Sequence, residues 1–232
     1  MRILIISDVH GNWNALRAVL REPHDAVMFL GDAVHFGPQP HECVEALRRH
    51  ATWSVCGNHD HGVAFNVDCR AYGTWKAWDD ATLEATRERL TPDDLAYLRR
   101  MPVIQQVAVD QTTFCLVHAA PTDPLYRYLP PDAPDDELIQ DLALADADIL
   151  LVGHTHVPMK RQFRRRTVVN PGSVGLPRIG SGAQYAVWED GEITLGTVPY
   201  DVSAFVAQLQ TLRLPAGVLA SLAAALEGRS NP

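Results

Sequence analysis

The sequence of this 232-residue chain predicts an α/β protein in which a mixed sheet system is covered by helices. Short apolar runs alternate with amphipathic stretches in the first half, a pattern typical of strands joined by helices. In the second half, apolar runs follow one another across short turns, which is typical of hairpins. The first-half runs are apolar without alternation, so we expect the parallel part of the sheets to be covered on both faces.

The first half contains three predicted strands and three helical stretches. The strands are the apolar runs at residues 2–6, 26–30 and 53–55. The helical patterns lie at residues 12–21, about 40–49 and 68 to about 101. Asn12 is the expected N-cap of the first helix. The last pattern restarts at residue 91, where Thr91 can cap and Pro92 takes the first helical position.

The second half is predicted to be richer in strands. They are expected at residues 103–109, 113–119, 148–152, 159–163, 167–169, 183–188 and 192–198, with a helix at 135–145. A proline-rich loop covers 121–134 and favours a rigid connection. No glycine- and serine-rich linker separates the halves, so we expect a single domain over residues 1–232, with a helical tail at about 201–228.

Composition and charge narrow the class of protein. Hydrophobic residues make up 47% and charged residues 21%, which is ordinary for a globular chain. A formal net charge of -8 disfavours general binding along nucleic-acid backbones. Four widely spaced cysteines lack metal-knuckle spacing, which favours buried thiols in a reducing compartment. The sequence shows no signal peptide or membrane span, so the expected location is cytoplasmic and no membrane partner is expected.

Five apolar runs end in aspartate, histidine or asparagine, three of them through a glycine. These endings are Asp8-Val9-His10, Gly31-Asp32, Gly57-Asn58-His59-Asp60, His118 and Gly153-His154-Thr155-His156. Each has a simpler explanation, since a lone histidine often serves a structural hydrogen bond and an aspartate after glycine often caps a helix. Ligand sites in open α/β sheets lie beyond the carboxyl ends of strands. Five such endings therefore predict one shared site at one edge.

The residue types at these strand ends indicate metal chemistry. Carboxylate, imidazole and amide donors without a thiolate suit Mn, Fe, Zn, Co or Ni. Seven or eight ligands exceed one tetrahedral site and suit two cations that share a carboxylate. Two cations about 3.5–4 Å apart can clamp a phosphoryl group and activate a bridging water. A nearby imidazole can then protonate a leaving alkoxide.

The same motifs, in the same order, resemble the calcineurin-like metallophosphoesterase superfamily. The resemblance covers roughly residues 1–200 and is carried by DVH, GD, GNHD, His118 and GHTH. The segments DVHGN and NPGSVG resemble the small bacterial branch that includes YfcE-type phosphodiesterases. This resemblance implies a four-layer α/β/β/α sandwich built from two mixed sheets.

The resemblance also implies a role for each residue. The first cation would be held by Asp8, His10, Asp32 and His156, and the second by Asp32, Asn58, His118 and His154, with Asp32 shared. His59 would be the catalytic imidazole, oriented by Asp60 or Asp8, and Asn58 and His59 would contact the substrate. The expected cofactors are two divalent transition metal ions, manganese first, with iron, zinc, nickel or cobalt open. The expected reaction is hydrolysis of a small phosphate ester, most readily a diester, by a metal-bridging hydroxide.

Alternatives on the same fold stay open at the level of sequence. A phosphomonoesterase or a nuclease would use the same site, and the basic run at 160–166 is the only support for a nucleic-acid substrate. A non-catalytic metal-binding scaffold is disfavoured because His59 and every ligand position are present. Ser173 and Arg178 could reach a substrate phosphate or could simply order their loop. His35, His41 and His61 are expected at the surface or behind the ligands.

Overall fold

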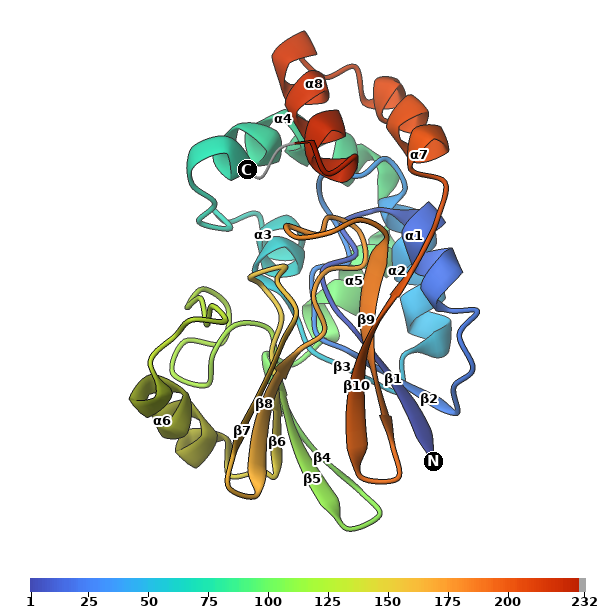
Figure 1. Ribbon diagram of the computed structural model, residues 1–232. Helices are drawn as coiled ribbons and strands as arrows, with labels where there is room; N and C mark the ends of the chain where they lie inside the picture. The colour runs from blue at the N-terminus through green and yellow to red at the C-terminus, as the bar shows by residue number, and fades with distance from the viewer. Residues whose placement is uncertain (230–232) are drawn as a thin grey trace.

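A computed structural model of the chain describes residues 1–229 (Figure 1). Two five-stranded sheets pack face to face, and helices cover their outer faces, which confirms the predicted mixed α/β architecture. The first sheet has the order β10-β9-β1-β2-β3, in which β1 (Arg2–Ile6), β2 (Ala26–Phe29) and β3 (Trp53–Ser54) are parallel. The hairpin of β9 (Ala183–Glu189) and β10 (Glu192–Val198) joins antiparallel to β1.

The second sheet has the order β4-β5-β6-β8-β7 and is also mixed. Its parallel centre consists of β5 (Thr112–Val117), β6 (Ile149–Leu151) and β8 (Arg166–Asn170). The antiparallel edges are β4 (Ile104–Val109) and β7 (Met159–Phe163). The two edge strands form hairpins with β5 and β8, as the short turns predict.

The helices divide among three places. The outer face of the first sheet is covered by α1 (Trp13–Val19), α2 (Pro40–His50), α3 (Asn58–Phe65) and α5 (Pro92–Arg100). The second sheet is covered by α6 (Asp135–Ala145). A separate apolar cluster joins α4 (Gly73–Arg89), α7 (Val202–Leu209), the 3-10 turn Gln210–Leu212 and α8 (Ala216–Leu226) above the carboxyl ends of the strands (Figure 1).

The expected double coverage of the parallel strands is visible in β1. Ile3 and Ile5 face the core between the sheets, whereas Leu4 and Ile6 face the helices. Asn12 caps α1 as predicted, because its Oδ1 accepts a hydrogen bond from Ala15 N at 3.0 Å. The four cysteines are buried with free thiols. Among residues 1–229, no helix is both long and apolar enough to cross a membrane.

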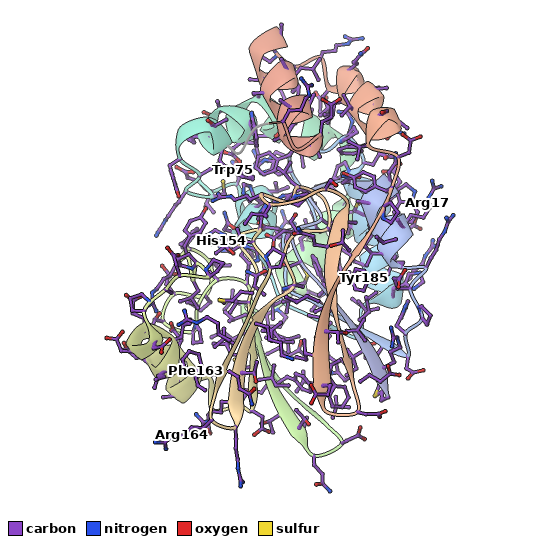
Figure 2. The ribbon with its side chains drawn as sticks, in the orientation of Figure 1. Arg17, Trp75, His154, Phe163, Arg164 and Tyr185 are labelled. Carbon is purple, nitrogen blue, oxygen red and sulfur yellow. The ribbon has the colours of Figure 1, made fainter. Side chains whose placement is uncertain are left out.

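Two segments differ from the sequence expectation. The helix α3 begins inside the GNHD motif, where no helix was expected, and the long helical stretch from 68 to 101 begins only at Gly73. That stretch is broken between α4 and α5, at the predicted restart, where Thr91 Oγ1 accepts a hydrogen bond from Asp94 N. The basic run at 160–166 forms the β7–β8 hairpin, whose tip at Arg164 lies far from His154 (Figure 2).

Candidate metal centre

The candidate site lies where the loops after the parallel strands of both sheets meet. Backbone hydrogen bonds join neighbouring loops within each sheet. Val9 N donates to Asp32 O at 2.8 Å in the first sheet, and Gly153 N donates to His118 O at 2.7 Å in the second. The motifs that end the apolar runs therefore lie at one edge, because parallel neighbours end at the same side of a sheet.

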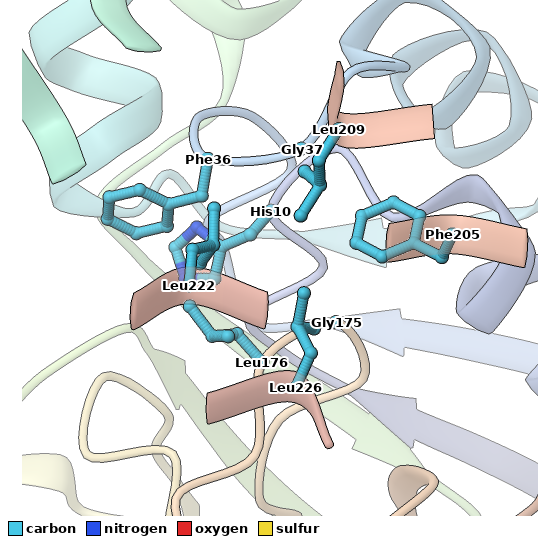
Figure 3. Close-up of a pocket in the computed structure, with 9 residues that line it drawn as sticks. All are labelled: His10, Phe36, Gly37, Gly175, Leu176, Phe205, Leu209, Leu222 and Leu226. Atoms are coloured by element: carbon cyan, nitrogen blue, oxygen red, sulfur yellow. The ribbon is translucent and has the colours of Figure 1, made fainter. Parts of the chain in front are cut away.

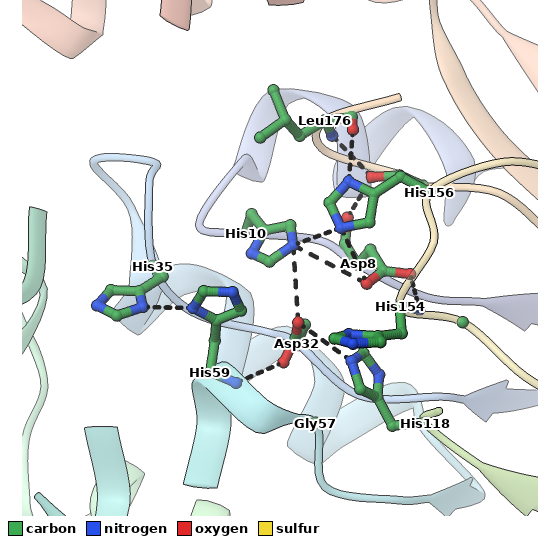
Figure 4. A network of polar contacts seen from close by, with 12 residues as sticks. Asp8, His10, Asp32, His35, Gly57, His59, His118, His154, His156 and Leu176 are labelled. Carbon is green, nitrogen blue, oxygen red and sulfur yellow. Dashed lines mark hydrogen bonds and ion pairs between the residues drawn. The ribbon is translucent and has the colours of Figure 1, made fainter. Parts of the chain in front are cut away.

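Six of the expected metal ligands form two compact groups, and all six side chains are buried. Within each group, one potential ligand atom of every residue lies within 4.8 Å of the others. We call these group one, which is Asp8, His10 and His156, and group two, which is Asp32, His118 and His154 (Figure 4).

Asp32 lies between the two groups. Its Oδ2 atom is 3.2 Å from His118 Nε2 in group two and 3.8 Å from His10 Nε2 in group one. Its Oδ1 atom accepts a hydrogen bond from His59 N at 2.9 Å, which fixes the carboxylate in this position. The Asp32 carboxylate therefore lies close enough to both groups to be a ligand of a cation in either one.

Three of the four histidines in these groups are oriented by backbone carbonyls. The Nδ1 atoms of His10, His118 and His156 donate to Val34 O at 3.1 Å, Leu30 O at 2.7 Å and Leu176 O at 2.7 Å. Because a carbonyl can only accept, each of these Nδ1 atoms carries a proton. When such a ring is neutral, its Nε2 atom carries an available lone pair, which is the usual arrangement behind metal-binding histidines.

Each group also contains a buried polar atom that has no hydrogen-bond partner within residues 1–229. These atoms are Asp8 Oδ1 in group one and His154 Nε2 in group two. A buried polar atom without a partner is costly, and at a functional site it needs an explanation such as an ion. The oxygen and nitrogen donors of both groups fit borderline divalent cations.

The charges of the two groups also favour bound cations. Burial alone would raise the pKa of Asp8, but the imidazole of His156 lowers it to about 2. Burial alone would lower the pKa of His118, but the carboxylate of Asp32 raises it to about 9. Burial lowers the pKa of His154 to about 3, which keeps that ring neutral. The buried carboxylates are therefore ionised and require positive charge beside them.

The backbone of these residues is unusual. Asp8, His10, Asp32, His154 and His156 have φ angles of 55°, 50°, 62°, 64° and 57°, in the left-handed region. Non-glycine residues rarely adopt this region, and each costs of order 1 kcal/mol or more unless the surroundings enforce it. Such strain clusters at functional sites because it aims side chains that an unstrained turn would not.

Asn58 and His59 lie at the start of α3, next to both groups. Asn58 Nδ2 donates to Cys69 O at 2.9 Å, which turns its Oδ1 atom toward His118 Nε2 at 3.1 Å. The His59 ring lies 5.2 Å from the His10 ring, centre to centre. Its Nδ1 atom is 2.7 Å from His35 Nδ1 and 3.5 Å from Asp79 Oδ1.

Asp60 and Asp8 were both expected to be able to orient His59, but the contacts of their carboxylates lie elsewhere, those of Asp8 with His154 N and His156 Nε2. Both Asp60 carboxylate oxygens accept backbone hydrogen bonds, from Asp32 N and Ala33 N at 2.8 Å each and from Gly57 N at 3.2 Å. Asp60 therefore holds the Asp32 turn in place.

The residues beside His59 Nδ1 are His35 and Asp79. Sequence reasoning did not link either of them to His59. A signal existed, because Asp79 lies on the buried face of α4 with Trp75 and Thr82. His35 is buried behind His59, which is the second of the two places expected for it.

An arginine and two aromatic rings border the two groups. Tyr128 packs on His154 at a ring separation of 4.0 Å, and Trp75 lies 5.0 Å from His156. The Arg178 guanidinium lies 4.8 Å from the Trp75 ring centre and 5.9 Å from that of Tyr128. The loop 121–134 thus contacts the site through Tyr128. Ser173 is buried and orders its loop, since its Oγ donates to Asp8 O at 2.7 Å.

The C-terminal helices close the other side of group one. His10 and Phe36 line a narrow apolar pocket together with Phe205, Leu222 and Leu226 from α7 and α8 (Figure 3). These three side chains are buried in the cluster that also contains Trp75 and Trp78. The helical tail, which the sequence left without a role, therefore supports the loops that carry the site.

The model of the calcineurin-like phosphoesterase superfamily domain matches residues 1–190. The chain belongs to this family. Its members are metal-dependent phosphoester hydrolases, which agrees with the donor atoms of groups one and two and confirms the resemblance of the motifs.

Individual relatives cover almost the whole chain. An uncharacterized protein of Methanocaldococcus jannaschii is 30% identical over 92% of this chain and 93% of its own length. Phosphodiesterase YfcE of Escherichia coli is 24% identical over 90% of this chain and 97% of its own length. A metallophosphoesterase structure from Sphaerobacter thermophilus has a TM-score of 0.82 and 31% identity, and it covers 97% of this chain and 99% of its own.

Proposed function

We propose that this chain is a dinuclear metal-dependent phosphodiesterase. The observation that carries the proposal is the position of the Asp32 carboxylate, within 4 Å of a histidine from each of two buried ligand groups. Asp8, His10, Asp32 and His156 would hold one cation, and Asp32, Asn58, His118 and His154 the other. Two such cations supply Lewis-acid activation of water and of phosphoryl oxygens. Manganese is the first candidate.

The residues around the two groups would bind and orient the ester. The Asn58 amide is fixed beside group two by its bond to Cys69 O. Within residues 1–229, the Nε atom of Arg178 is buried without a hydrogen-bond partner, and its guanidinium lies over the Trp75 ring. A half-buried guanidinium beside a metal centre suits an anionic substrate group, which it could bind through two N–H donors.

His59 is suited to protonate the leaving alkoxide. Its Nδ1 atom contacts His35 and Asp79, so Nε2 is the nitrogen left for the substrate. Burial alone would lower the pKa of His59, but the carboxylates of Asp32 and Asp79 raise it well above its ordinary value. A protonated imidazole at this place can donate to the departing oxygen. The phosphodiesterase name of the E. coli relative supports a diester substrate.

The test is metal-dependent hydrolysis of bis(p-nitrophenyl) phosphate by the manganese-loaded chain, with p-nitrophenyl phosphate as the monoester comparison. On a diester with an alkyl leaving group, which needs a proton far more than p-nitrophenolate does, His59→Ala should lower kcat by about 10²- to 10⁴-fold while the metal content is unchanged. His154→Ala should lose bound metal. The matched control is His61→Ala, two residues along α3, whose ring packs on Phe65. If His59→Ala hydrolyses the alkyl diester as fast as His61→Ala, the assigned role of His59 is wrong.

A further inference from the structure

Four metal-binding side chains lie behind His59, outside groups one and two. We call them the rear cluster, which consists of His35, His59, Cys69 and Asp79. They come from the loop after β2, the start of α3, the loop between α3 and α4, and α4 itself. All four are buried, and one potential ligand atom of each lies within 4.8 Å of the others.

The distances between donor atoms in the rear cluster are close to the donor–donor distances in a metal site. His35 Nδ1 is 2.7 Å from His59 Nδ1 and 2.9 Å from Asp79 Oδ1. Asp79 Oδ1 is 3.5 Å from His59 Nδ1 and 3.2 Å from Cys69 Sγ. Bonds in a tetrahedral zinc site place neighbouring donors roughly 3.3–3.8 Å apart. Side-chain shifts of roughly half an ångström would therefore complete the coordination.

An open cavity leads to the rear cluster from the surface. Its volume is ≈ 300 Å³, and His35, Cys69 and Asp79 line it. No residue of group one or group two lines this cavity. Two more carboxylates, Asp68 and Asp80, line it together with one lysine, so the cavity attracts cations. An ion could thus reach the rear cluster by a route that is separate from groups one and two.

The donor chemistry separates the rear cluster from groups one and two. Groups one and two contain only carboxylates and imidazoles, whereas Cys69 adds a sulfur donor. Thiolate and imidazole together favour zinc and disfavour magnesium, calcium and manganese. A cell or a buffer that supplies manganese and zinc would therefore fill the two kinds of site differently.

We propose that the rear cluster is a third metal site, selective for a zinc-like cation, whose occupancy inhibits hydrolysis. The inhibition rests on the proposed role of His59. On binding, the Cys69 thiol proton and any Nδ1 proton of His35 or His59 are released to solvent, and the sulfur and the two Nδ1 atoms become ligands. Coordination through Nδ1 fixes the His59 ring at the rear cluster. The ring then cannot follow the departing oxygen, and its proton donation to the leaving alkoxide is impaired.

Cobalt reports this site directly, because a cobalt–thiolate bond has a charge-transfer absorption that oxygen and nitrogen ligands do not give. The full chain is saturated with Mn²⁺, freed of excess metal and titrated with Co²⁺, and bound ions are counted by mass spectrometry. Wild type and the control Cys115→Ser, whose buried thiol lies in β5, should bind an extra ion and show the band. Cys69→Ser should lose both, and its inhibition by zinc is compared with its own rate without zinc.

Zinc should inhibit the wild type and Cys115→Ser at least tenfold more strongly than Cys69→Ser. Asp79→Asn, which keeps the thiol, should bind the third ion at least tenfold more weakly. A wild type without the thiolate band, or a Cys69→Ser variant that keeps it, overturns the proposal. A chain that shows the band but hydrolyses no ester supports the third site and refutes the proposed function.

Discussion

Gly57 is the position at which one methyl group should disable the centre. A Cβ atom there would lie 2.0 Å from Asp32 Oδ1, 2.5 Å from Asp32 N and 2.7 Å from Asp32 Cγ, where ordinary contact begins at 3.4 Å. Because a backbone nitrogen is among these atoms, a change of side-chain rotamer cannot relieve the clash. Gly57→Ala must therefore move the Asp32 turn by roughly 1 Å, a displacement that can cost about 10²-fold in rate.

The rate loss corresponds to about 2.7 kcal/mol in the activation free energy. Overpacking should also lower the free energy of unfolding by about 1–3 kcal/mol. The assay measures kcat/KM for bis(p-nitrophenyl) phosphate, bound manganese and urea unfolding on the same preparations. Gly217→Ala in α8 is the matched control, since nothing lies within 4 Å of its Cβ position. If Gly57→Ala keeps both ions and a rate within about threefold of Gly217→Ala, the reasoning about Asp32 fails.

Four further outcomes are expected. The hydrogen bond to Asp94 raises the pKa of His41 above its ordinary 6.5, so His41 stabilises the fold fully below that pH and its contribution is lost as pH rises through the raised value. The free energy of unfolding measured with urea should therefore be higher for wild type than for His41→Gln, by at most about 1 kcal/mol. This difference should shrink above neutral pH. Arg178→Gln should raise KM for the diester about tenfold at nearly constant kcat, since a charged hydrogen bond contributes about 1.5 kcal/mol. Arg70→Gln, whose guanidinium lies 4.0 Å above Tyr126, should leave KM unchanged. Leu222→Ala should lower the free energy of unfolding by about 2–5 kcal/mol in the same measurement. Removal of metal by a chelator should lower the free energy of unfolding by about 2.7 kcal/mol for each ion removed, relative to protein with free metal at 100 times its Kd.

The sequence was sufficient to predict the features that depend on local patterns. Apolar runs predicted the strands, and the polar residues at their ends predicted a common edge, because parallel strands end at the same side of a sheet. Asn12 and Thr91 were predictable caps because a cap contacts residues only two or three positions away. These inferences needed no knowledge of how distant segments pack.

The features that sequence reasoning missed depend on contacts between distant segments. His35 and Asp79 meet across 44 positions of the chain, and Tyr128 reaches His154 from a loop without any motif. The start of α3 was missed because its residues NHDHGVAF carry no apolar stripe. One local signal was available, since an acidic residue three positions after Gly57 is typical of a helix N-terminus, and it would have predicted the structural role of Asp60.

The division of ligands between the sheets explains why the centre and the fold depend on each other. Asp8, His10 and Asp32 follow strands of the first sheet, whereas the histidines at 118, 154 and 156 follow strands of the second. Group one takes His156 from the second sheet, and group two takes Asp32 from the first. A cation in either group would therefore bond to both sheets at the open end of their shared core. Sheet packing brings the donors together, and bound metal in turn opposes separation of the sheets, because ions that bind only the folded state stabilise it.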